Sequence, residues 1–209
     1  MIRHGESRAQ AARLFVGHAT CTGLSDLGRT QAEALRDRLV RTDELGTVDA
    51  VYTSILARSI ETAAVLGPAI GDVAPVAECD WCEIHPGSAE GLTFEELALR
   101  FPPTGDVDDP FHRRAPDGET WAEYYVRVGA RLRRLAHEHP GETVVVVGHG
   151  GTVGASFVTL GNLGMRSGFG VTRETLNTSL TEWRWTGREW RLVRFNDAAH
   201  LADIQVADL

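Results

Sequence analysis

Apolar positions along this chain follow two spacings, one typical of amphipathic helices and one typical of buried strands. After Ser25, apolar side chains recur from Leu27 to Leu39 at helical intervals, which predicts a helix with Ser25 as its N-cap. Residues 144–147 are four consecutive valines, the pattern of a strand that is buried on both faces. The same two spacings predict further strands at 48–52, 73–77, 180–185 and 190–195, and further helices at 54–66, 93–101, 120–139 and after 151.

Predicted strands and helices alternate along most of the chain, which indicates an α/β layered fold with a largely parallel sheet. Residues 103–118 are rich in Pro, Asp and Gly and are predicted to form an exposed loop. No internal repeat and no shift in composition marks a boundary, so we expect residues 1–209 to form a single domain.

The composition excludes several kinds of chemistry. The formal net charge is -8, and all 21 basic residues are arginine. Without lysine the chain can run neither Schiff-base catalysis nor a Walker-type phosphate loop, because both need a lysine amine. The acidic balance argues against nucleic acid as a partner. No apolar run approaches the ~18 residues of a membrane span, so we expect no membrane association.

The cysteines are few and odd in number, as expected of a cytoplasmic protein with reduced thiols: Cys21, Cys79 and Cys82. Cys79 and Cys82 have the spacing of a redox or metal motif. No second pair of that kind completes a zinc site, so the sequence favours a purely structural role for these thiols.

Candidate chemistry collects where predicted strands end. His4 follows a short apolar stretch that begins the chain at Met1-Ile2, His149 follows the four-valine strand, and each histidine is followed by glycine. Arg3 precedes the first histidine, and Arg58 begins a helix after the 48–52 strand, at the same edge of the sheet. Two imidazoles and two guanidinium groups at one edge are typical of a pocket for a tetrahedral dianion. Taken singly, each of these residues would more often be structural or solvated.

These residues also carry a resemblance to a known family. The segment Arg3-His4-Gly5-Glu6-Ser7 resembles the N-terminal signature of the histidine phosphatase superfamily, which has the phosphoglycerate mutase-like fold. Further segments similar to the family follow in the family's order and span nearly the whole chain: 24–32, 52–63, 83–93, 148–151 and 196–201. The resemblance implies a three-layer α/β sandwich, with a largely parallel central sheet flanked by helices.

The resemblance also implies a mechanism. His4 would attack phosphorus and become a phosphohistidine, while Arg3, Arg58 and His149 would hold the equatorial oxygens. Glu83 would protonate the leaving alkoxide and then activate the water that hydrolyses the intermediate. No metal and no cofactor is expected, because the arginine and histidine side chains neutralise the phosphate charge.

The chain departs from the family pattern in three places: at Gln10, in the loop at Gly17-His18 and at its N-terminus. Gln10 stands where many members have an asparagine that touches the phosphate, and Gly150 stands where one branch has its acidic aspartate. We therefore expect Gln10 and Gly150 at the phosphate and assign the acid to Glu83. Gly17-His18 occupies the place of a substrate-contacting loop, so His18 either faces the substrate or is exposed to solvent.

Only three residues precede His4, whereas family members usually have a longer apolar strand there. We therefore expect the natural start of the protein to lie upstream.

The expected activity is metal-independent hydrolysis of a small phosphomonoester. Two alternatives stay open: a cofactor-dependent mutase, and a catalytically silent phosphate-binding scaffold. The mutase is less favoured, because the 103–118 loop is acidic and Arg113 and Arg114 are its only cations. Aromatic and histidine side chains that could line the leaving-group pocket are Trp81, His85, Phe94, Phe111 and Trp121. The late hairpin carries Trp183, Trp185 and Trp190, which cover a sheet face or form the contact of a homodimer.

Overall fold

The computed structural model describes residues 1–106, 109–165 and 175–204. Within these residues, six strands form one sheet in the order β3-β2-β4-β1-β5-β6. Strands β1 to β4 run parallel to one another, and β5 runs antiparallel to both β1 and β6, so the sheet is largely parallel as predicted. The strands are β1 (Ile2–Arg3), β2 (Ala50–Thr53), β3 (Val76–Ala77), β4 (Val144–Gly148), β5 (Leu180–Trp185) and β6 (Trp190–Asp197).

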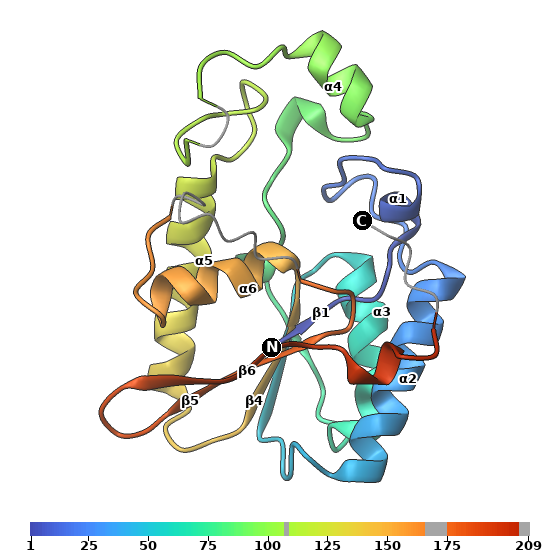
Figure 1. Ribbon diagram of the computed structural model, residues 1–209, viewed down its shortest axis with the longest axis vertical. Coiled ribbons are helices and arrows are strands. Elements are labelled where there is room, and N and C mark those ends of the chain that lie inside the picture. The colour runs from blue at the N-terminus through green and yellow to red at the C-terminus, as the bar shows by residue number, and fades with distance from the viewer. Residues whose placement is uncertain (107–108, 166–174, 205–209) are drawn as a thin grey trace.

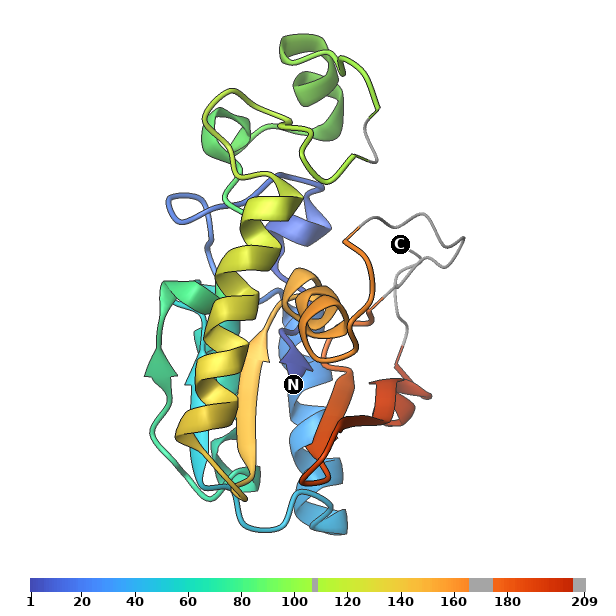
Figure 2. The same ribbon diagram turned by 90° about the vertical axis from the view of Figure 1, so that its left-hand side faces the viewer.

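Helices cover both faces of the sheet, which makes a three-layer sandwich (Figure 1; Figure 2). Helices α2 and α3 lie on one face, and α5 and α6 lie on the other. The helices are α1 (Arg8–Ala11), α2 (Asp26–Thr42), α3 (Ala57–Leu66), α4 (Phe94–Arg100), α5 (Trp121–Glu138) and α6 (Gly150–Thr159). Short 3-10 helices are η1 (Gly67–Ala69), η2 (Cys79–Trp81), η3 (Gly87–Ala89) and η4 (Ala199–Leu201).

The valines of β4 divide the core in two. Val145 and Val147 belong to the cluster that includes Leu35 of α2 and Leu66 of α3. Val146 belongs to the cluster on the opposite face, with Leu132 of α5. Successive side chains of a strand point to opposite faces, so a run of valines fills both layers. Each fully buried valine or leucine stabilises the fold by about 1.5–3 kcal/mol.

Polar side chains set the helix boundaries. The Ser25 hydroxyl accepts from the Gly28 amide and caps α2, as predicted. Thr93 and Thr120 each form a capping box with the glutamate three residues later, and α4 and α5 begin there.

Some predicted boundaries were wrong. The helix predicted from 54 begins at Ala57, because Leu56 has an extended backbone with φ -75° and ψ 133°. The strand predicted at 73–77 is reduced to β3, and α1 was not predicted at all.

On the late hairpin, Trp183 packs edge-on against Phe157 of α6, whereas Trp185 is 52% exposed and pairs with the Trp190 ring. The side chain of Trp183 therefore serves the packing of α6 on the sheet. The homodimer stays a prediction.

The described segment between β3 and α5, residues 78–106 and 109–120, is here called the cap. It extends beyond the carboxyl ends of the parallel strands and carries α4 (Figure 1). Its own small cluster of Ala89, Leu97 and Ala115 is buried, and Phe15 packs against that cluster from the N-terminal loop. The cap therefore stands over the edge of the sheet at which the sequence places the candidate site.

Strand pairing brings the two candidate histidines together. β1 pairs with β4 so that Arg3 lies opposite Gly148, and the His4 amide donates to the Gly148 carbonyl at 2.9 Å. His4 and His149 each follow directly after this register pair, so both lie at the carboxyl edge of the central strands. In the part of the chain that the structure describes, no helix has the length and apolar character needed to cross a membrane.

Candidate active site

The ring of His4 is held in one tautomer. Its Nδ1 lies 2.6 Å from the Gly5 carbonyl oxygen, and a carbonyl can only accept, so Nδ1 carries the proton and donates. The Nε2 atom then has a free lone pair, which accepts from Arg58 Nε at 3.1 Å. The backbone carbonyl of His4 accepts a hydrogen bond from the side-chain amide nitrogen Nδ2 of Asn177 at 2.9 Å. The unprotonated ring nitrogen of His4 therefore points at the centre of the site.

The ring of His149 lies beside that of His4, with ring centroids 5.0 Å apart. His149 is the N-cap residue of α6 and is fully buried. Its Nδ1 accepts from Arg58 Nε at 3.4 Å, and on the other side of the ring Nε2 lies 2.9 Å from Ser54 Oγ. The neutral ring therefore donates from Nε2 to Ser54 and turns Nδ1 toward Arg58 and His4.

Arg58 is the point where these contacts converge. It is the second residue of α3 and only 4% exposed, and its Nε lies within reach of both imidazoles. Its NH1 donates to Cys21 Sγ at 3.3 Å. Among the described residues no carboxylate forms an ion pair with Arg58. A buried cation without an anionic partner is costly, so this arrangement favours the binding of an anion.

Arg3 adds a second guanidinium from β1. Its NH1 donates to the carbonyl of Thr175. A Cβ placed on Gly150 would lie 4.0 Å from Arg3 Nε, so the Arg3 side chain passes close to the first residue of α6. The structure thus brings Arg3, Arg58, His4 and His149 together at one end of the sheet, as the sequence predicted.

Burial and charge keep both histidines neutral. Burial, followed by the positive charges of Arg58 and Arg3, holds the pKa of His4 well below its ordinary value of 6.5. Burial, Arg58 and the neighbouring His4 likewise hold the pKa of His149 well below 6.5. A dianion bound between these groups would favour their protonated forms and oppose both effects. The free site therefore presents neutral imidazoles beside fixed cations.

Glu83 reaches the same site from the cap. Its Oε2 accepts from the Gly151 amide at 3.1 Å, and its Oε1 accepts from the Ile84 amide at 3.1 Å. Gly151 lies in the first turn of α6, two residues after His149, so the carboxylate lies at the positive end of the helix dipole. The buried Tyr124 hydroxyl is close by, and burial together with Glu83 raises the pKa of Tyr124 well above 10.0. The Glu83 carboxylate therefore lies at the edge of the site that His4 and His149 form.

Gln10 is engaged elsewhere. Its side-chain amide forms a reciprocal pair with Asn177, with Gln10 Nε2 donating at 3.1 Å and Asn177 Nδ2 donating back at 3.2 Å. Through Asn177 it connects to the His4 carbonyl. Gln10 thus supports the backbone of His4, and its contact with phosphate stays a prediction. Gly150, the first residue of α6, lies beside Arg3 as described above.

A cavity lies within the cap, and its lining there begins one residue after Glu83. Its lining includes Ile84 and His85, which follow Glu83 directly, together with Arg114 and Trp121. Of the other aromatic candidates, Trp81 is fully buried in the core, whereas Phe94 and Phe111 are 59% and 71% exposed. His85 and Trp121 are therefore the two sequence candidates that line this cavity.

Sequence reasoning missed several partners in the site. Ser54 follows β2 at the carboxyl edge of the sheet, a position that could have marked it, whereas no local signal distinguishes Asn177 or Tyr124. The sequence favours a structural role for Cys79 and Cys82 because no second cysteine pair accompanies them, and it does not indicate that two histidines lie beside them. The structure gathers His18, Cys79, Cys82 and His85 into one cluster, with all four ligand atoms within 4.8 Å of one another.

Comparisons with known proteins agree with this geometry. The chain matches the sequence model of the histidine phosphatase superfamily (branch 1) over residues 1–198. It is 30% identical over 212 residues to phosphoglycerate mutase-like protein 4 of Arabidopsis thaliana, a match that covers 97% of this chain and 86% of that protein. It is 27% identical over 210 residues to the metal-independent phosphoserine phosphatase of Arabidopsis thaliana, covering 98% of this chain and 83% of that protein. A solved mycobacterial glucosyl-3-phosphoglycerate phosphatase, in complex with VO3, superposes with a TM-score of 0.77 at 26% identity, covering 94% of this chain and 97% of the other.

Proposed function

The chain belongs to the histidine phosphatase superfamily and is a phosphoric monoester hydrolase, and from this premise we propose that it hydrolyses small phosphomonoesters through a phosphohistidine at His4. The observation that carries the proposal is the position of Arg58 Nε, 3.1 Å from His4 Nε2 and 3.4 Å from His149 Nδ1. One buried guanidinium between two neutral imidazoles suits a phosphoryl group that sits between them.

In the first step, His4 Nε2 attacks phosphorus in line with the leaving oxygen. The N–P bond forms as the P–O bond to the leaving group breaks. The hydrogen bond from Nδ1 to the Gly5 carbonyl supports this step, because it stabilises the positive charge that the ring gains. Arg3, Arg58 and His149 hold the equatorial oxygens, where negative charge is concentrated in the transition state.

Glu83 serves as the general acid and base. In the first step its carboxyl protonates the leaving alkoxide, and in the second the carboxylate takes a proton from the water that attacks the phosphohistidine. Its hydrogen bonds to the amides of Gly151 and Ile84 fix the carboxylate beside α6. The substrate's leaving group would lie in the cavity lined by His85, Arg114 and Trp121, next to Glu83.

Hydrolysis suits this site better than transfer between two hydroxyls of a bisphosphorylated intermediate. Of the two cations in the 103–118 loop, Arg113 is paired with Glu123 at 2.6 Å and also donates to the Gly118 carbonyl. That leaves Arg114 as the loop cation that lines the cavity. A mutase must hold a second phosphate and exclude water, which needs more cationic groups around the substrate.

A panel of phosphomonoesters tests the proposal. The panel should contain p-nitrophenyl phosphate, phosphoserine and glucosyl-3-phosphoglycerate, with release of inorganic phosphate as the readout. We expect turnover by the wild type and none above background by His4→Ala. Incubation with 3-phosphoglycerate and 2,3-bisphosphoglycerate, followed by analysis for the 2-phospho isomer, tests the mutase. Isomerisation faster than hydrolysis would contradict hydrolysis as the main activity. Phosphate binding without any turnover would identify a scaffold.

A further inference from the structure

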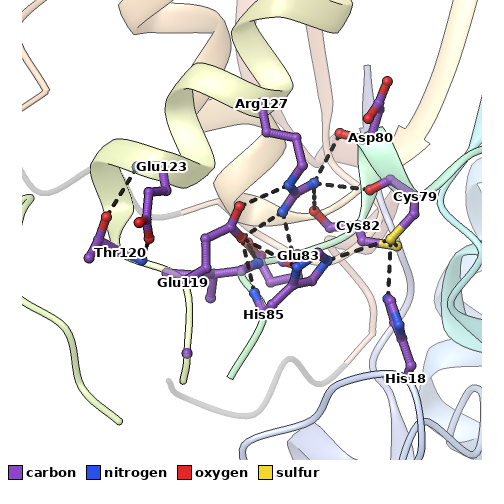
Figure 3. Close-up of polar contacts among 12 residues, drawn as sticks. His18, Cys79, Asp80, Cys82, Glu83, His85, Glu119, Thr120, Glu123 and Arg127 are labelled. Atoms are coloured by element: carbon purple, nitrogen blue, oxygen red, sulfur yellow. Dashed lines mark hydrogen bonds and ion pairs between the residues drawn. The ribbon is translucent and has the colours of Figure 1, made fainter. Parts of the chain in front are cut away.

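The cap carries a second cluster of reactive side chains, beside the phosphate pocket. Cys79, Cys82 and His85 come from one short segment in C-x2-C-x2-H spacing, and His18 comes from the N-terminal loop. Their four ligand atoms lie within 4.8 Å of one another (Figure 3). Here we propose that these four residues bind one zinc ion. The proposal does not depend on the proposed reaction: none of the four attacks, holds or protonates the phosphoryl group, and only His85 also lines the cavity proposed for the leaving group.

The distances suit tetrahedral coordination. Cys79 Sγ lies 3.2 Å from His18 Nε2 and 3.5 Å from His85 Nε2. Zinc bonds of about 2.3 Å to sulfur and about 2.0 Å to nitrogen place such atoms about 3.5 Å apart. The two sulfur atoms are 2.9 Å apart, well beyond the ~2.05 Å of a disulfide, and both cysteines are free. Tetrahedral binding would move the sulfurs apart by less than about 1 Å.

The donor set selects the metal. Two thiolates and two imidazoles form the S2N2 set that is typical of zinc among the common divalent ions. Binding would release two protons, one from each thiol, and leave a site with no net charge. All four coordination positions are then taken by the protein, which is typical of a structural site.

Surrounding residues already hold the segment in shape. Arg127 of α5 donates to the backbone carbonyls of Cys79, Asp80 and Cys82 at 3.0 to 3.2 Å (Figure 3). Glu119 pairs with Arg127 at 2.7 Å and accepts from the His85 amide at 3.1 Å.

The orientation of His85 is also that of a ligand. Its Nε2 faces Cys79, and its Nδ1 lies 4.0 Å from the Glu119 carboxylate. A ligating imidazole commonly donates its second N–H to a carboxylate, and Glu119 is the carboxylate on that side of the His85 ring, although 4.0 Å is beyond hydrogen-bond distance. The segment 79–85 therefore directs its two sulfur atoms and its imidazole nitrogen toward one point.

A zinc ion here would add a connection between the N-terminal loop and the cap, which already share backbone hydrogen bonds between Phe15 and residues 91–92. His18 is exposed on the N-terminal loop, whereas the other three ligands belong to the cap. Glu83 lies between Cys82 and His85, so the ion would also fix the segment that carries this carboxylate. We expect the metal to act on stability and on the order of the cap.

Metal analysis of the native protein tests the proposal. Protein without an affinity tag, incubated with zinc and dialysed, should contain about one zinc per chain by elemental mass spectrometry. Cys79→Ser and His85→Ala should lose this zinc. Cys21→Ser removes the third cysteine of the chain, and His137→Ala removes an exposed histidine at the end of α5, and both control variants should keep it. Zinc absent from the wild type, or retained by Cys79→Ser and His85→Ala, would overturn the assignment.

Cobalt substitution and thiol analysis of the wild type keep the test independent of how the variants fold. Cobalt substitution should give the thiolate charge-transfer and visible bands of tetrahedral S2N2 coordination, and a spectrum of aqueous cobalt would overturn the site. Intact mass and thiol titration in denaturant with chelator should find three free thiols, one for each cysteine of the sequence. A single free thiol and a mass lower by two hydrogens would show a Cys79–Cys82 disulfide instead and overturn the proposal. Prolonged chelation should lower the melting temperature of the wild type and not that of Cys79→Ser.

Discussion

Gly151 offers a sharp test of the role of Glu83. A Cβ placed on Gly151 would overlap Glu83 Oε1 and would come within 2.7 Å of the Tyr124 hydroxyl. The Tyr124 hydroxyl overlaps this Cβ as well, so in Gly151→Ala both the Glu83 carboxylate and the buried Tyr124 side chain have to shift. Ordinary contact requires a displacement of about 1 Å, and a catalytic group misplaced by that distance costs about 100-fold in rate. This corresponds to about 2.7 kcal/mol of transition-state stabilisation.

The assay compares two kinds of leaving group. An alkyl phosphate needs full protonation of its leaving oxygen, so its kcat/KM should fall about 100-fold in Gly151→Ala. The first-turnover release of p-nitrophenolate should fall much less, because this anion leaves with little help from an acid. Gly154→Ala is the matched control on the same helix, since its Cβ would meet Tyr125 at 3.7 Å, an ordinary contact. This control should keep its activity and gain about 0.5–1 kcal/mol of stability. Unchanged alkyl phosphate hydrolysis by Gly151→Ala, or equal losses in both variants, would refute the assignment.

Four further predictions concern His4, the pH dependence of stability, Arg58 and Arg38. In proton–nitrogen NMR titrations of the free protein, His4 should protonate with a midpoint well below pH 6.5, because burial, Arg58 and Arg3 lower its pKa. Bound inorganic phosphate should raise this midpoint. A midpoint at or above pH 6.5 in the free protein would contradict the prediction. A histidine with a lowered pKa stays neutral in the folded state, while the same histidine in the unfolded chain takes up a proton below pH 6.5. The free energy of unfolding, measured in urea, should therefore fall as the pH drops below 6.5, by up to about 1.4 kcal/mol per pH unit for each such histidine. Arg58→Ala should lower kcat/KM about 100- to 1000-fold, as loss of a transition-state donor does, and near-wild-type rates would remove Arg58 from the phosphate site. Arg38→Met should destabilise the fold by about 1–3 kcal/mol in urea, because it removes a guanidinium that is bidentate to Asp197 at 2.8 and 2.6 Å. The half-buried carboxylate would keep only the longer ion pair with Arg194 at 3.5 Å and the amide of Ala199. An unchanged unfolding midpoint would show that the pair contributes nothing.

The sequence predicted the elements that its local chemistry determines. Consecutive valines at 144–147 require two buried faces, and Ser25, Thr93 and Thr120 supply cap oxygens at three helix starts. The elements it missed or misplaced are short. The two-residue strands β1 and β3 depend on pairing with neighbours that are distant in sequence, so no local period predicts their length.

The candidate site likewise contains residues that strand ends predict and residues that they do not. His4, His149 and Arg58 each lie directly after or near a strand end, so the topology of a parallel sheet predicts that they meet. Glu83 could be assigned only from the family pattern, because its contact with Gly151 crosses from the cap to α6.

The cluster of His18, Cys79, Cys82 and His85 cannot be predicted from one sequence motif. The sequence contains C-x2-C-x2-H in one stretch, but His18 lies 61 residues before Cys79. Only the position of the N-terminal loop against the cap brings this fourth ligand to the other three. Asn177 is similar, since it approaches the His4 carbonyl across a separation of 173 residues.

The central claim is that His4 carries the phosphoryl group during turnover. Its most direct test is rapid quenching of the wild type with a labelled phosphomonoester, followed by peptide mass spectrometry under conditions that preserve phosphohistidine. We predict an acid-labile phosphoryl group on the peptide that contains His4, formed and lost at rates that account for turnover, and none in His4→Ala. Continued hydrolysis by His4→Ala, or turnover of the wild type with the label on another residue, would contradict the account.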